Sequence, residues 1–385
     1  MTTLQRHRDL QHGQVDRTIL FLVLLLVAIG TVMVYSASST MAMAKFGDSA
    51  YYLKRHLIRV AIGLSLMYLF ARVRYRRVVR LGRPLLAVSF ATLLLVLLPG
   101  LGGVAAKGAN RWLALGPFVF QPSELARFAL LLWLADTLAT RRDMLDRFTD
   151  GLLPILAPVA AAAALIVIEP DFSTAVAVAA ICGGMIFLAG ARILHLGGLV
   201  AGAMPLIYFA LISSEYRKAR IVAFLEGAGD VTGANYQVWQ SLIGLGSGGF
   251  IGKGLGNGAQ KLRFLPEPFN DFIFSIVGEE LGLVGALVLL MLFLLLVIRG
   301  FRVAASVNSP VGAILSAGVS LSIGLYVLIN IGVVTSLLPA TGLALPFISY
   351  GGSSLIFSMA SVGMLLSISR DVELEPIKFG RRRRR

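Results

Sequence analysis

The residues best suited to chemistry are carboxylates that lie at or inside long apolar stretches. Asp271 stands where a polar, glycine-rich segment gives way to the apolar run 272–298, and Glu279 and Glu280 follow roughly two to three helical turns later. An acid at a lipid boundary is costly and a deeper one is costlier, so such residues usually face a bundle interior or a wet cavity and serve a function. A carboxylate at a helix mouth can accept a proton as a general base. We therefore predict that Asp271 is the chemical centre.

A second charged group opens the apolar stretch PSELARFA. Glu124 and Arg127 are three residues apart and therefore share one face of the predicted helix, which Ser123 can cap. A capped helix with a surface ion pair would explain this pattern and would add little stability. The depth of the pair in an otherwise apolar helix favours instead a charged pair that lines a cavity.

A third acidic group lies in IEPDFSTA, where Pro170 must break the helix between two apolar runs. Glu169 and Asp171 flank this proline. One interpretation is a tight turn in which Asp171 caps the following helix. The other is that Asp171 lines the same cavity as Glu124. The residues alone leave both interpretations open.

Basic residues crowd the end of the seventh apolar run in SEYRKAR, which includes Arg217 and Arg220. Arginine forks match phosphate oxygens well, so this cluster is suited to a phosphate ligand. Anchoring of the chain at the membrane interface explains such a cluster equally well.

The stretch 244–258 contains eight glycines and superficially resembles a nucleotide-binding loop. No alternating strand pattern precedes it, so neither a Rossmann site nor a P-loop is predicted. We expect a flexible re-entrant loop that lies against the membrane.

A broken stretch of backbone follows the ninth apolar run. Asn330 interrupts that run, and the segment after it contains Pro339, Pro346 and three glycines. Non-helical backbone at membrane depth is tolerated only where protein or water satisfies its polar groups, so this segment should line a cavity. Ser349 and Ser353 belong to it and are predicted to face the same cavity. A simple turn is the alternative.

Membrane helices must position these residues, because the composition is far from that of a soluble protein. Of 385 residues, 57% are hydrophobic and 14% are charged, and the mean hydropathy is +0.82. Soluble chains are about 45–50% apolar. The formal net charge of +15 could suggest a nucleic-acid partner. The basic residues are spread over the ends of apolar segments instead of forming one face, so no such partner is predicted.

Cysteine and histidine usage argues against two further classes. Cys182 is the only cysteine and lies in an apolar run, and the four histidines are scattered singly. A disulfide framework and a zinc site built from these residues are therefore not predicted. The first apolar run, 18–34, is long enough to cross a bilayer, so we interpret it as a span instead of a cleavable signal peptide.

Windows of about 20 apolar residues predict an all-α, polytopic fold with about ten transmembrane helices. A short amino-terminal segment, 1–16, precedes the transmembrane domain, 17–370, and a basic tail, 371–385, follows it. A large polar segment, 214–271, separates spans seven and eight.

The placement of arginine and lysine predicts the orientation of these spans, because cytoplasmic connections carry an excess of positive charge. The basic residues gather in alternate connections, at the amino end, in 72–83 and 140–151, at 192, at 299–302 and in the tail. That side is predicted to be cytoplasmic and to hold both termini. The remaining connections, and Asp271 with them, are then external: 38–56, 101–121, 214–271 and 339–352.

Several motifs in this order resemble the SEDS family (shape, elongation, division and sporulation) of polytopic peptidoglycan glycosyltransferases. The resemblance covers about residues 17–370, and its motifs are MVYSASS at 33–39, GANRWLALGPFVFQPSELARFA at 108–129, EPDFSTA at 169–175, the segment 236–282 and LPFISYGGSS at 345–354. VYSAS and PFISYGGSS are more similar to FtsW-type members than to RodA-type members. The resemblance implies a protein of the bacterial cytoplasmic membrane that serves septal or elongation cell-wall synthesis.

Some positions depart from the usual pattern of the family. Arg127 stands where lysine is commoner, Ser173 and Ser336 stand where glycine is commoner, and Phe269-Asn270 precedes the aspartate where His-Thr is frequent. Arg127 keeps the charge of lysine but not its point-donor geometry, which argues against a proton-handling role there. The other departures bear on loop geometry and not on the reaction.

The resemblance implies polymerisation of lipid II. The 4-hydroxyl of an acceptor sugar attacks the anomeric carbon of a donor sugar, and undecaprenyl pyrophosphate leaves. Asp271 would be the base, because the family's catalytic aspartate falls at this position of the motif. Either a divalent cation such as Mg or Mn, held by Asp271, or a set of basic side chains would neutralise the pyrophosphate. The basic set is Arg217, Arg220, Lys261 and Arg263.

The resemblance also suggests roles for the remaining charged residues and for partners. Glu124, Arg127 and Asp171 would shape the cavity, and Glu280 would do the same or pair within the bundle. The expected partners are a class B penicillin-binding protein, which is a transpeptidase, and other divisome or elongasome proteins. Two other functions remain open: a lipid II flippase, because intramembrane acids and broken helices also suit a transporter, and a division scaffold.

Overall fold

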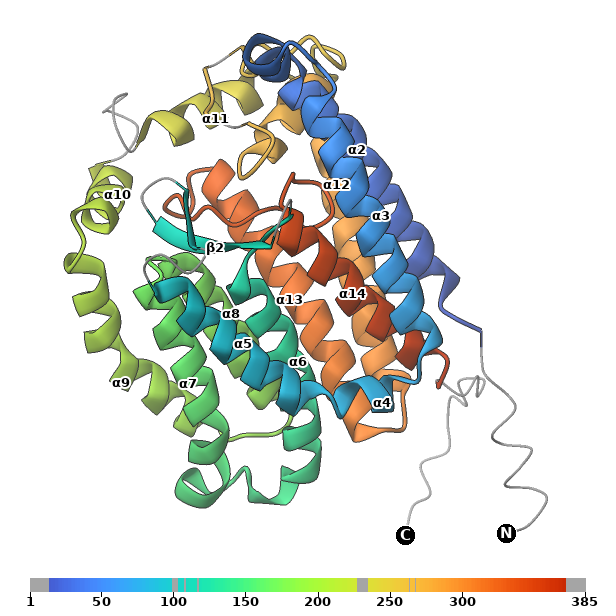
Figure 1. Cartoon of the computed structure of the whole chain (residues 1–385), viewed down its shortest axis with the longest axis vertical. Helices are drawn as coiled ribbons and strands as arrows, with labels where there is room; N and C mark the ends of the chain where they lie inside the picture. The colour runs from blue at the N-terminus through green and yellow to red at the C-terminus, as the bar shows by residue number, and fades with distance from the viewer. Residues whose placement is uncertain are drawn as a thin grey trace, which may run out of the picture.

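The computed structural model describes residues 14–98, 103–106, 109–115, 118–226, 235–262, 264–266 and 268–371. Each predicted apolar run forms a helix, which confirms the all-α, polytopic prediction (Figure 1). These helices are α2 (Arg17–Phe46), α3 (Tyr51–Arg72), α5 (Gly82–Leu97), α6 (Pro122–Thr140), α7 (Leu153–Ile168), α8 (Phe172–Leu188), α9 (Ile193–Ile212), α12 (Ile273–Ser306), α13 (Pro310–Val334) and α14 (Gly352–Ser369).

Within the described residues, six helices are long and apolar enough to cross a membrane. They are α2, α9, α12, α13, α14 and the stretch Phe148–Ile168, which joins the π-helical turn η2 (Phe148–Leu152) to α7. The helices α5 and α8 are apolar but shorter. The chain is therefore a multi-pass membrane protein.

Helix α14 lies at the centre of the bundle, and α9 lies at its edge. Nearly every residue of α14 is buried, and this helix packs most extensively along α3. The approach of the two helices is close at Gly363, where a Cβ atom would lie 2.6 Å from the carbonyl oxygen of Met67. By contrast, no residue of α9 is fully buried, and only some of its side chains, such as Leu196 and Leu199, pack against the core.

Short elements fill the connections. The helix α4 (Tyr75–Val79) and the 3₁₀ turn η1 (Arg142–Met144) lie at one end of the bundle (Figure 1). The connection before α6 forms a three-stranded antiparallel sheet of β1 (Gly103–Ala106), β2 (Ala109–Leu115) and β3 (Phe118–Phe120). The sequence reasoning did not predict these strands. The polar segment before α12 contains α10 (Glu215–Glu226) and α11 (Tyr236–Ser247).

The predicted continuous helix over 272–298 is wrong in one respect, because Gly282 interrupts it with φ 69° and ψ −169°. Only glycine adopts this backbone conformation without strain. The glycine-rich segment pairs with the groups that the break frees. The amides of 253–254 donate to the carbonyls of 279–280, and the amides of 283–284 donate to the carbonyls of 249–250, at 2.9 to 3.1 Å. The expected flexible loop is thus hydrogen-bonded to α12.

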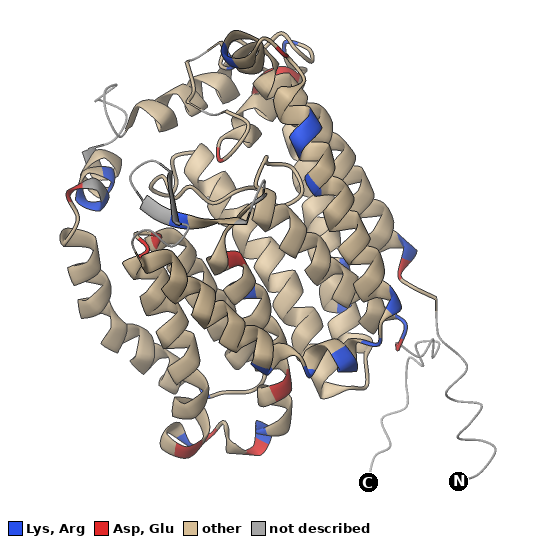
Figure 2. Cartoon of the chain, in the orientation of Figure 1, with Lys and Arg blue, Asp and Glu red and all other residues tan. Residues whose placement is uncertain are grey.

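Basic residues gather at the end of the bundle that holds α4, with others on α3 and α10 (Figure 2). The arginines of the connection 72–83 and the turn at 299–302 belong to this end. The glycine-rich segment, α11 and the start of α12 lie at the opposite end (Figure 1). The two ends of the bundle therefore differ in charge and in backbone regularity.

Candidate active site

Asp271 lies two residues before the first residue of α12, at the helix mouth where the sequence places it. Its backbone carbonyl oxygen accepts a hydrogen bond from the side-chain amide of Asn330 at 2.8 Å. The same amide donates to the carbonyl of Leu343, also at 2.8 Å. Asn330 therefore joins the segment before α12 to the broken segment after α13.

The broken segment approaches the carboxylate of Asp271 closely. Gly342 adopts φ +82°, and a Cβ atom on it would lie 3.6 Å from Oδ2 of Asp271. Further along, the amide of Tyr350 donates to the carbonyl of Phe269 at 3.0 Å. Ser349 stabilises the intervening turn, because its hydroxyl accepts from the amide of Leu345 at 2.9 Å. This hydroxyl is therefore a turn-forming group here.

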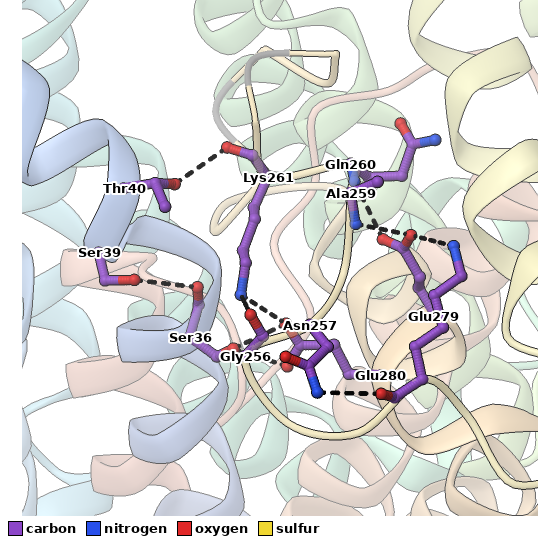
Figure 3. Close-up of polar contacts among 11 residues, drawn as sticks. Ser36, Ser39, Thr40, Gly256, Asn257, Ala259, Gln260, Lys261, Glu279 and Glu280 are labelled. Atoms are coloured by element: carbon purple, nitrogen blue, oxygen red, sulfur yellow. Dashed lines mark hydrogen bonds and ion pairs between the residues drawn. The ribbon is translucent and has the colours of Figure 1, made fainter.

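Glu279 fastens the glycine-rich segment to the first part of α12 (Figure 3). Its side chain is fully buried and accepts hydrogen bonds from the backbone amides of Ala259 at 2.8 Å and Gln260 at 3.1 Å. The ammonium of Lys253 donates to it at 2.9 Å. A buried carboxylate with three donors is satisfied, so Glu279 holds this segment in place.

Glu280 joins three elements in the same region (Figure 3). Its carboxylate is fully buried and accepts from the hydroxyl of Ser36 on α2 at 2.6 and 2.8 Å. The ammonium of Lys261 donates to it at 3.1 Å and also donates to the carbonyl of Gly256. Lys261 is only 5% exposed. Its charge is therefore used inside the protein, which argues against the phosphate role expected of it.

The other basic residues expected to face a phosphate lie on or after α10. The guanidinium of Arg217 donates to the carbonyl of Ala210, and that of Arg220 donates to the carbonyl of Ala340 at 2.8 Å. The second contact brings α10 against the broken segment that also touches Asp271. Arg263 lies outside the described residues.

Glu124 and Arg127 form a buried pair, as their depth in the apolar helix predicts. The guanidinium donates to Oε2 of Glu124 at 2.6 and 3.0 Å, and the two residues are 4% and 3% exposed. Arg127 also donates to the hydroxyls of Ser322 at 2.7 Å and Ser358 at 3.4 Å, and it lies over the ring of Tyr326. The pair thus connects α6 with α13 and α14, and the surface interpretation is wrong.

Two serines lie near this pair. Ser123 does not cap α6, because the helix begins at Pro122 and places this serine inside the first turn, where its hydroxyl has no hydrogen-bond partner among the described residues. Ser353 joins two helices, since its hydroxyl accepts from the amide of Gln121 at 3.0 Å. Ser353 therefore fixes the start of α6 against the start of α14.

The structure confirms the capping interpretation of Asp171. Its carboxylate caps α8 by accepting from the amide of Thr174 at 3.4 Å. The side-chain amide of Gln121 donates to its other oxygen at 3.1 Å, which links it to the helix that holds Glu124. Arg111 lies 3.8 Å from the same carboxylate. Asp171 and the Glu124 pair are thus parts of one polar group beneath the small sheet.

Glu169 is an unexpected member of this group. Its side chain is 1% exposed, and neither carboxylate oxygen has a hydrogen-bond partner among the described residues. Burial and, less strongly, the neighbouring Asp171 raise the pKa of Glu169, and Arg111 opposes the rise, so that the pKa is about 8. The side chain is therefore largely protonated at neutral pH. The motif EPDF placed Glu169 at a helix end, but only the tertiary packing removes it from water.

The described residues contain no cluster of three His, Cys, Asp or Glu side chains that could enclose a metal ion. Magnesium, however, is often held by one or two carboxylates together with substrate phosphates and water. Asp271 fits that kind of site as its single protein carboxylate. A divalent cation bound there would supply positive charge to a phosphate-bearing substrate.

The geometry suits a transfer reaction at a lipid headgroup. A carboxylate stands at a helix mouth, held by Asn330 and approached by a bent backbone segment, while charged pairs lie deeper between the helices. Such a carboxylate can take a proton from a hydroxyl group.

Comparison with known proteins agrees with this arrangement. The family described as cell cycle protein, FtsW/RodA/SpoVE, matches residues 16–374. A probable peptidoglycan glycosyltransferase FtsW of Geobacter metallireducens is 43% identical over 361 residues, covering 94% of this chain and 96% of that protein. Stage V sporulation protein E of Bacillus subtilis is 40% identical over 357 residues, covering 92% and 97%.

Two solved structures are similar over almost the whole chain. One is a chain of a peptidoglycan synthase complex that coordinates polymerization and crosslinking, with a TM-score of 0.76, 30% identity and coverage of 94% of this chain and 99% of that chain. The other is the rod shape determining protein RodA of Thermus thermophilus, with a TM-score of 0.68, 31% identity and coverage of 94% and 98%. The match of sequence, fold and motif order shows that this chain belongs to the FtsW/RodA/SpoVE family.

Proposed function

We propose that this protein is a peptidoglycan glycosyltransferase that polymerises lipid II, with Asp271 as the general base. Relatives that match nearly the full chain carry the name peptidoglycan glycosyltransferase. The observation that carries the assignment of Asp271 is its fixed position at the mouth of α12, where Asn330 and the broken segment converge on it.

The reaction requires one proton transfer and one displacement. The 4-hydroxyl of the acceptor sugar gives its proton to the carboxylate of Asp271 as its oxygen bonds to the anomeric carbon of the donor sugar. The bond between that carbon and the pyrophosphate oxygen breaks, and undecaprenyl pyrophosphate leaves. Asp271 is only partly buried. This exposure supports access from the headgroup region.

The departing pyrophosphate needs positive charge, because its developing negative charge must be stabilised in the transition state. Arg220 supports this role through its contact with Ala340 in the segment that approaches Asp271. Arg217 on the same helix belongs to this set, whereas the buried pairing of Lys261 with Glu280 argues against including Lys261. A magnesium or manganese ion at Asp271 would supply the same charge when bound.

The active site lies on the outer face of the bacterial cytoplasmic membrane in this proposal, with both termini in the cytoplasm. The basic connections at the end that holds α4 support this orientation, because cytoplasmic connections carry excess arginine and lysine (Figure 2). The first relatives are of the FtsW type, which favours septal synthesis over elongation.

A glycan strand gains strength only when it is cross-linked, so the proposed partner is a class B penicillin-binding protein. The similarity to a chain of a peptidoglycan synthase complex supports such an assembly. Other division or elongation proteins would join it.

The direct experiment uses purified protein in dodecyl maltoside micelles with fluorescent lipid II. Micelles have no second compartment, so glycan polymer on a gel identifies an enzyme. If micellar protein makes no polymer but reconstituted vesicles move lipid II between leaflets, the protein is a transporter. Failure of both assays, with binding to division proteins retained, identifies a scaffold.

A chelator added to the micellar assay abolishes polymerisation if a divalent cation takes part, and full activity in chelator excludes that part of the proposal.

A further inference from the structure

The first turn of α14 lies against an arginine of α3 that the reaction above does not use. The guanidinium of Arg59 stacks over the ring of Tyr350, 4.4 Å from its centre. A Cβ atom on Gly352 would lie 3.0 Å from Nε of Arg59. Only a glycine at the first position of α14 leaves room for the guanidinium at this place. Arg59 is therefore fitted to the beginning of this helix.

The beginning of α14 is itself positive and lacks a cap. Its N-cap residue is Gly351, and no side chain of the described residues caps the helix. The first amides of an 18-residue helix carry partial positive charge and attract anions. Arg59 adds a full positive charge at the same point. Two positive groups at such short range repel each other, and an anion between them would remove the repulsion.

Buried hydrogen-bonding groups surround this point without partners. The hydroxyl of Ser354, in the first turn of α14, is buried and has no hydrogen-bond partner among the described residues. Its Cβ lies 3.5 Å from the position of a Cβ on Gly351, which places it beside the helix start. His56 is fully buried, neither of its ring nitrogens is hydrogen-bonded within the described part of the chain, and its ring faces that of Tyr350 at 6.0 Å. Buried polar groups of this kind can hydrogen-bond to a bound group.

No carboxylate of the described residues forms an ion pair with the arginines at this end of α3. Arg55 lies one turn before Arg59 and stacks over the ring of Tyr51 at 4.4 Å. By contrast, the neighbouring Lys54 pairs with Asp48 at 2.8 Å. Both guanidinium groups are held by aromatic rings, which fixes their position. Arg59 also hydrogen-bonds to the side chain of Tyr350, and a guanidinium has five N–H donors, so further donors remain for another acceptor.

This positive region adjoins the segment that carries Asp271. The amide of Tyr350 donates to the carbonyl of Phe269, and the two rings meet edge to face at 5.5 Å. Tyr52 of α3 packs on Phe269 at 4.5 Å. Phe269 is two residues before Asp271. A group bound by Arg59 would therefore lie on the α3 side of the catalytic segment, away from α10 (Figure 1).

We propose that Arg59 and the first turn of α14 bind the phosphate of a lipid headgroup. Arginine with helix-terminal amides is the donor set that recognises phosphate oxygens. The phosphate belongs either to a polyprenyl diphosphate, as in a lipid-linked sugar substrate, or to a membrane phospholipid. The first source rests on the function proposed above, whereas phosphate binding itself does not.

The test measures binding to purified full-length protein in dodecyl maltoside, which contains no phosphate. Farnesyl diphosphate and a short-chain phosphatidylglycerol are the two probes, and tryptophan fluorescence or thermophoresis reports the Kd. Arg59→Gln removes the charge and should weaken binding roughly ten-fold or more, since charged hydrogen bonds are lost. Arg72→Gln is the matched control, because Arg72 stacks over Tyr68 at the opposite end of the same helix and should leave the Kd unchanged.

A second variant protects the test against misfolding. Gly352→Ala keeps the charge of Arg59 but places a Cβ only 3.0 Å from its Nε, which pushes the guanidinium aside, so the variant should weaken binding in a protein whose thermal melt is close to normal. Arg59→Lys should restore part of the affinity. Tighter binding of farnesyl diphosphate than of phosphatidylglycerol identifies a substrate lipid, and equal binding identifies bulk phospholipid.

The proposal is overturned if neither probe binds the unmodified protein, or if Arg59→Gln binds both as well as the unmodified protein does. These outcomes do not decide whether the protein polymerises lipid II. Polymerisation of lipid II with no effect of Arg59→Gln on binding removes only the phosphate site. Binding that depends on Arg59 in a protein that makes no polymer removes only the polymerase.

Discussion

The side-chain amide of Asn330 donates a hydrogen bond to the backbone carbonyl of Asp271 at 2.8 Å, and its second donor reaches Leu343 at the same distance. One polar side chain in an apolar helix thus holds both the segment before α12 and the segment after α13. The position of the carboxylate proposed as the general base depends on this residue.

Replacing Asn330 by leucine should lower both stability and polymerisation. Leucine has a similar size but no donors, so two carbonyls lose their partner at a cost of about 1–3 kcal/mol each if they stay buried. We expect a lower melting temperature and a reduced polymerisation rate in micelles. Ser65→Ala is the control, because that exposed hydroxyl bonds only within its own helix. Unchanged melting and rate for Asn330→Leu would remove Asn330 from the site.

Gly342→Ala should impair activity more than stability. The alanine would be strained at φ +82° by about 1–2 kcal/mol, and its Cβ would stand 3.6 Å from Oδ2 of Asp271, where substrate must approach. Gly47→Ala is matched to it, because Gly47 has φ +69° and nothing within 4 Å of a Cβ. The two variants should melt alike, while only Gly342→Ala loses polymerisation. Equal activity of the two would show that Gly342 does not border the reacting groups.

Breaking the buried pair of Lys261 and Glu280 should be strongly destabilising. Glu280→Gln leaves the Lys261 ammonium buried without a counter-charge, at a cost of about 3–5 kcal/mol. The double variant with Lys261→Met removes both charges and should recover much of that loss. A double-mutant cycle of thermal melts measures the coupling. The exposed pair of Lys54 and Asp48 is the reference, for which roughly 0–1 kcal/mol is expected. Additive effects in the buried pair would disprove the coupling.

Glu169→Gln should stabilise the protein at alkaline pH. The carboxyl group has a pKa of about 8 in the folded protein instead of 4.5, so between these values the folded state keeps a proton that the unfolded state loses. Stability therefore falls as pH rises through this window, by an amount on the order of a few kcal/mol. Glutamine cannot ionise, so the variant should melt higher than the unmodified protein at about pH 8–9 and equally at about pH 4.

Melting curves across that pH range check the prediction for Glu169. Asp143→Asn, which changes an exposed carboxylate in η1, should reproduce the pH profile of the unmodified protein. A Glu169→Gln profile parallel to that of the unmodified protein at every pH would mean that Glu169 is ionised in the fold.

The helices and the position of Asp271 could be predicted because both follow from local patterns. Apolar runs of membrane length specify helices, and the charged pair in SELAR is visible from its three-residue spacing. The break at Gly282 has no comparable signal, because a lone glycine is common in membrane helices and only the pairing with residues 249–254 reveals its conformation.

Partners distant in the sequence account for most of what could not be predicted. Lys261 carries a charge suited to phosphate, yet the fold pairs it with Glu280. The carboxylate of Glu280 also accepts from the hydroxyl of Ser36, more than 200 residues earlier in the sequence. The sequence did not predict a role for Arg59, because an arginine near the start of a span is typical of an anchor at the membrane interface. Its contact with the first turn of α14 becomes apparent only when these two helices are packed together.

Asp271→Asn is the variant that tests the central claim most directly. The amide keeps the shape of the side chain but cannot accept the acceptor hydroxyl's proton, so initial-rate polymerisation of lipid II in micelles should fall by about 100-fold or more. Asp48→Asn, at another exposed carboxylate, should polymerise at the normal rate. The predicted result is loss of polymer by Asp271→Asn with an unchanged thermal melt. Polymer formation by a folded Asp271→Asn protein at the unmodified rate would contradict the account.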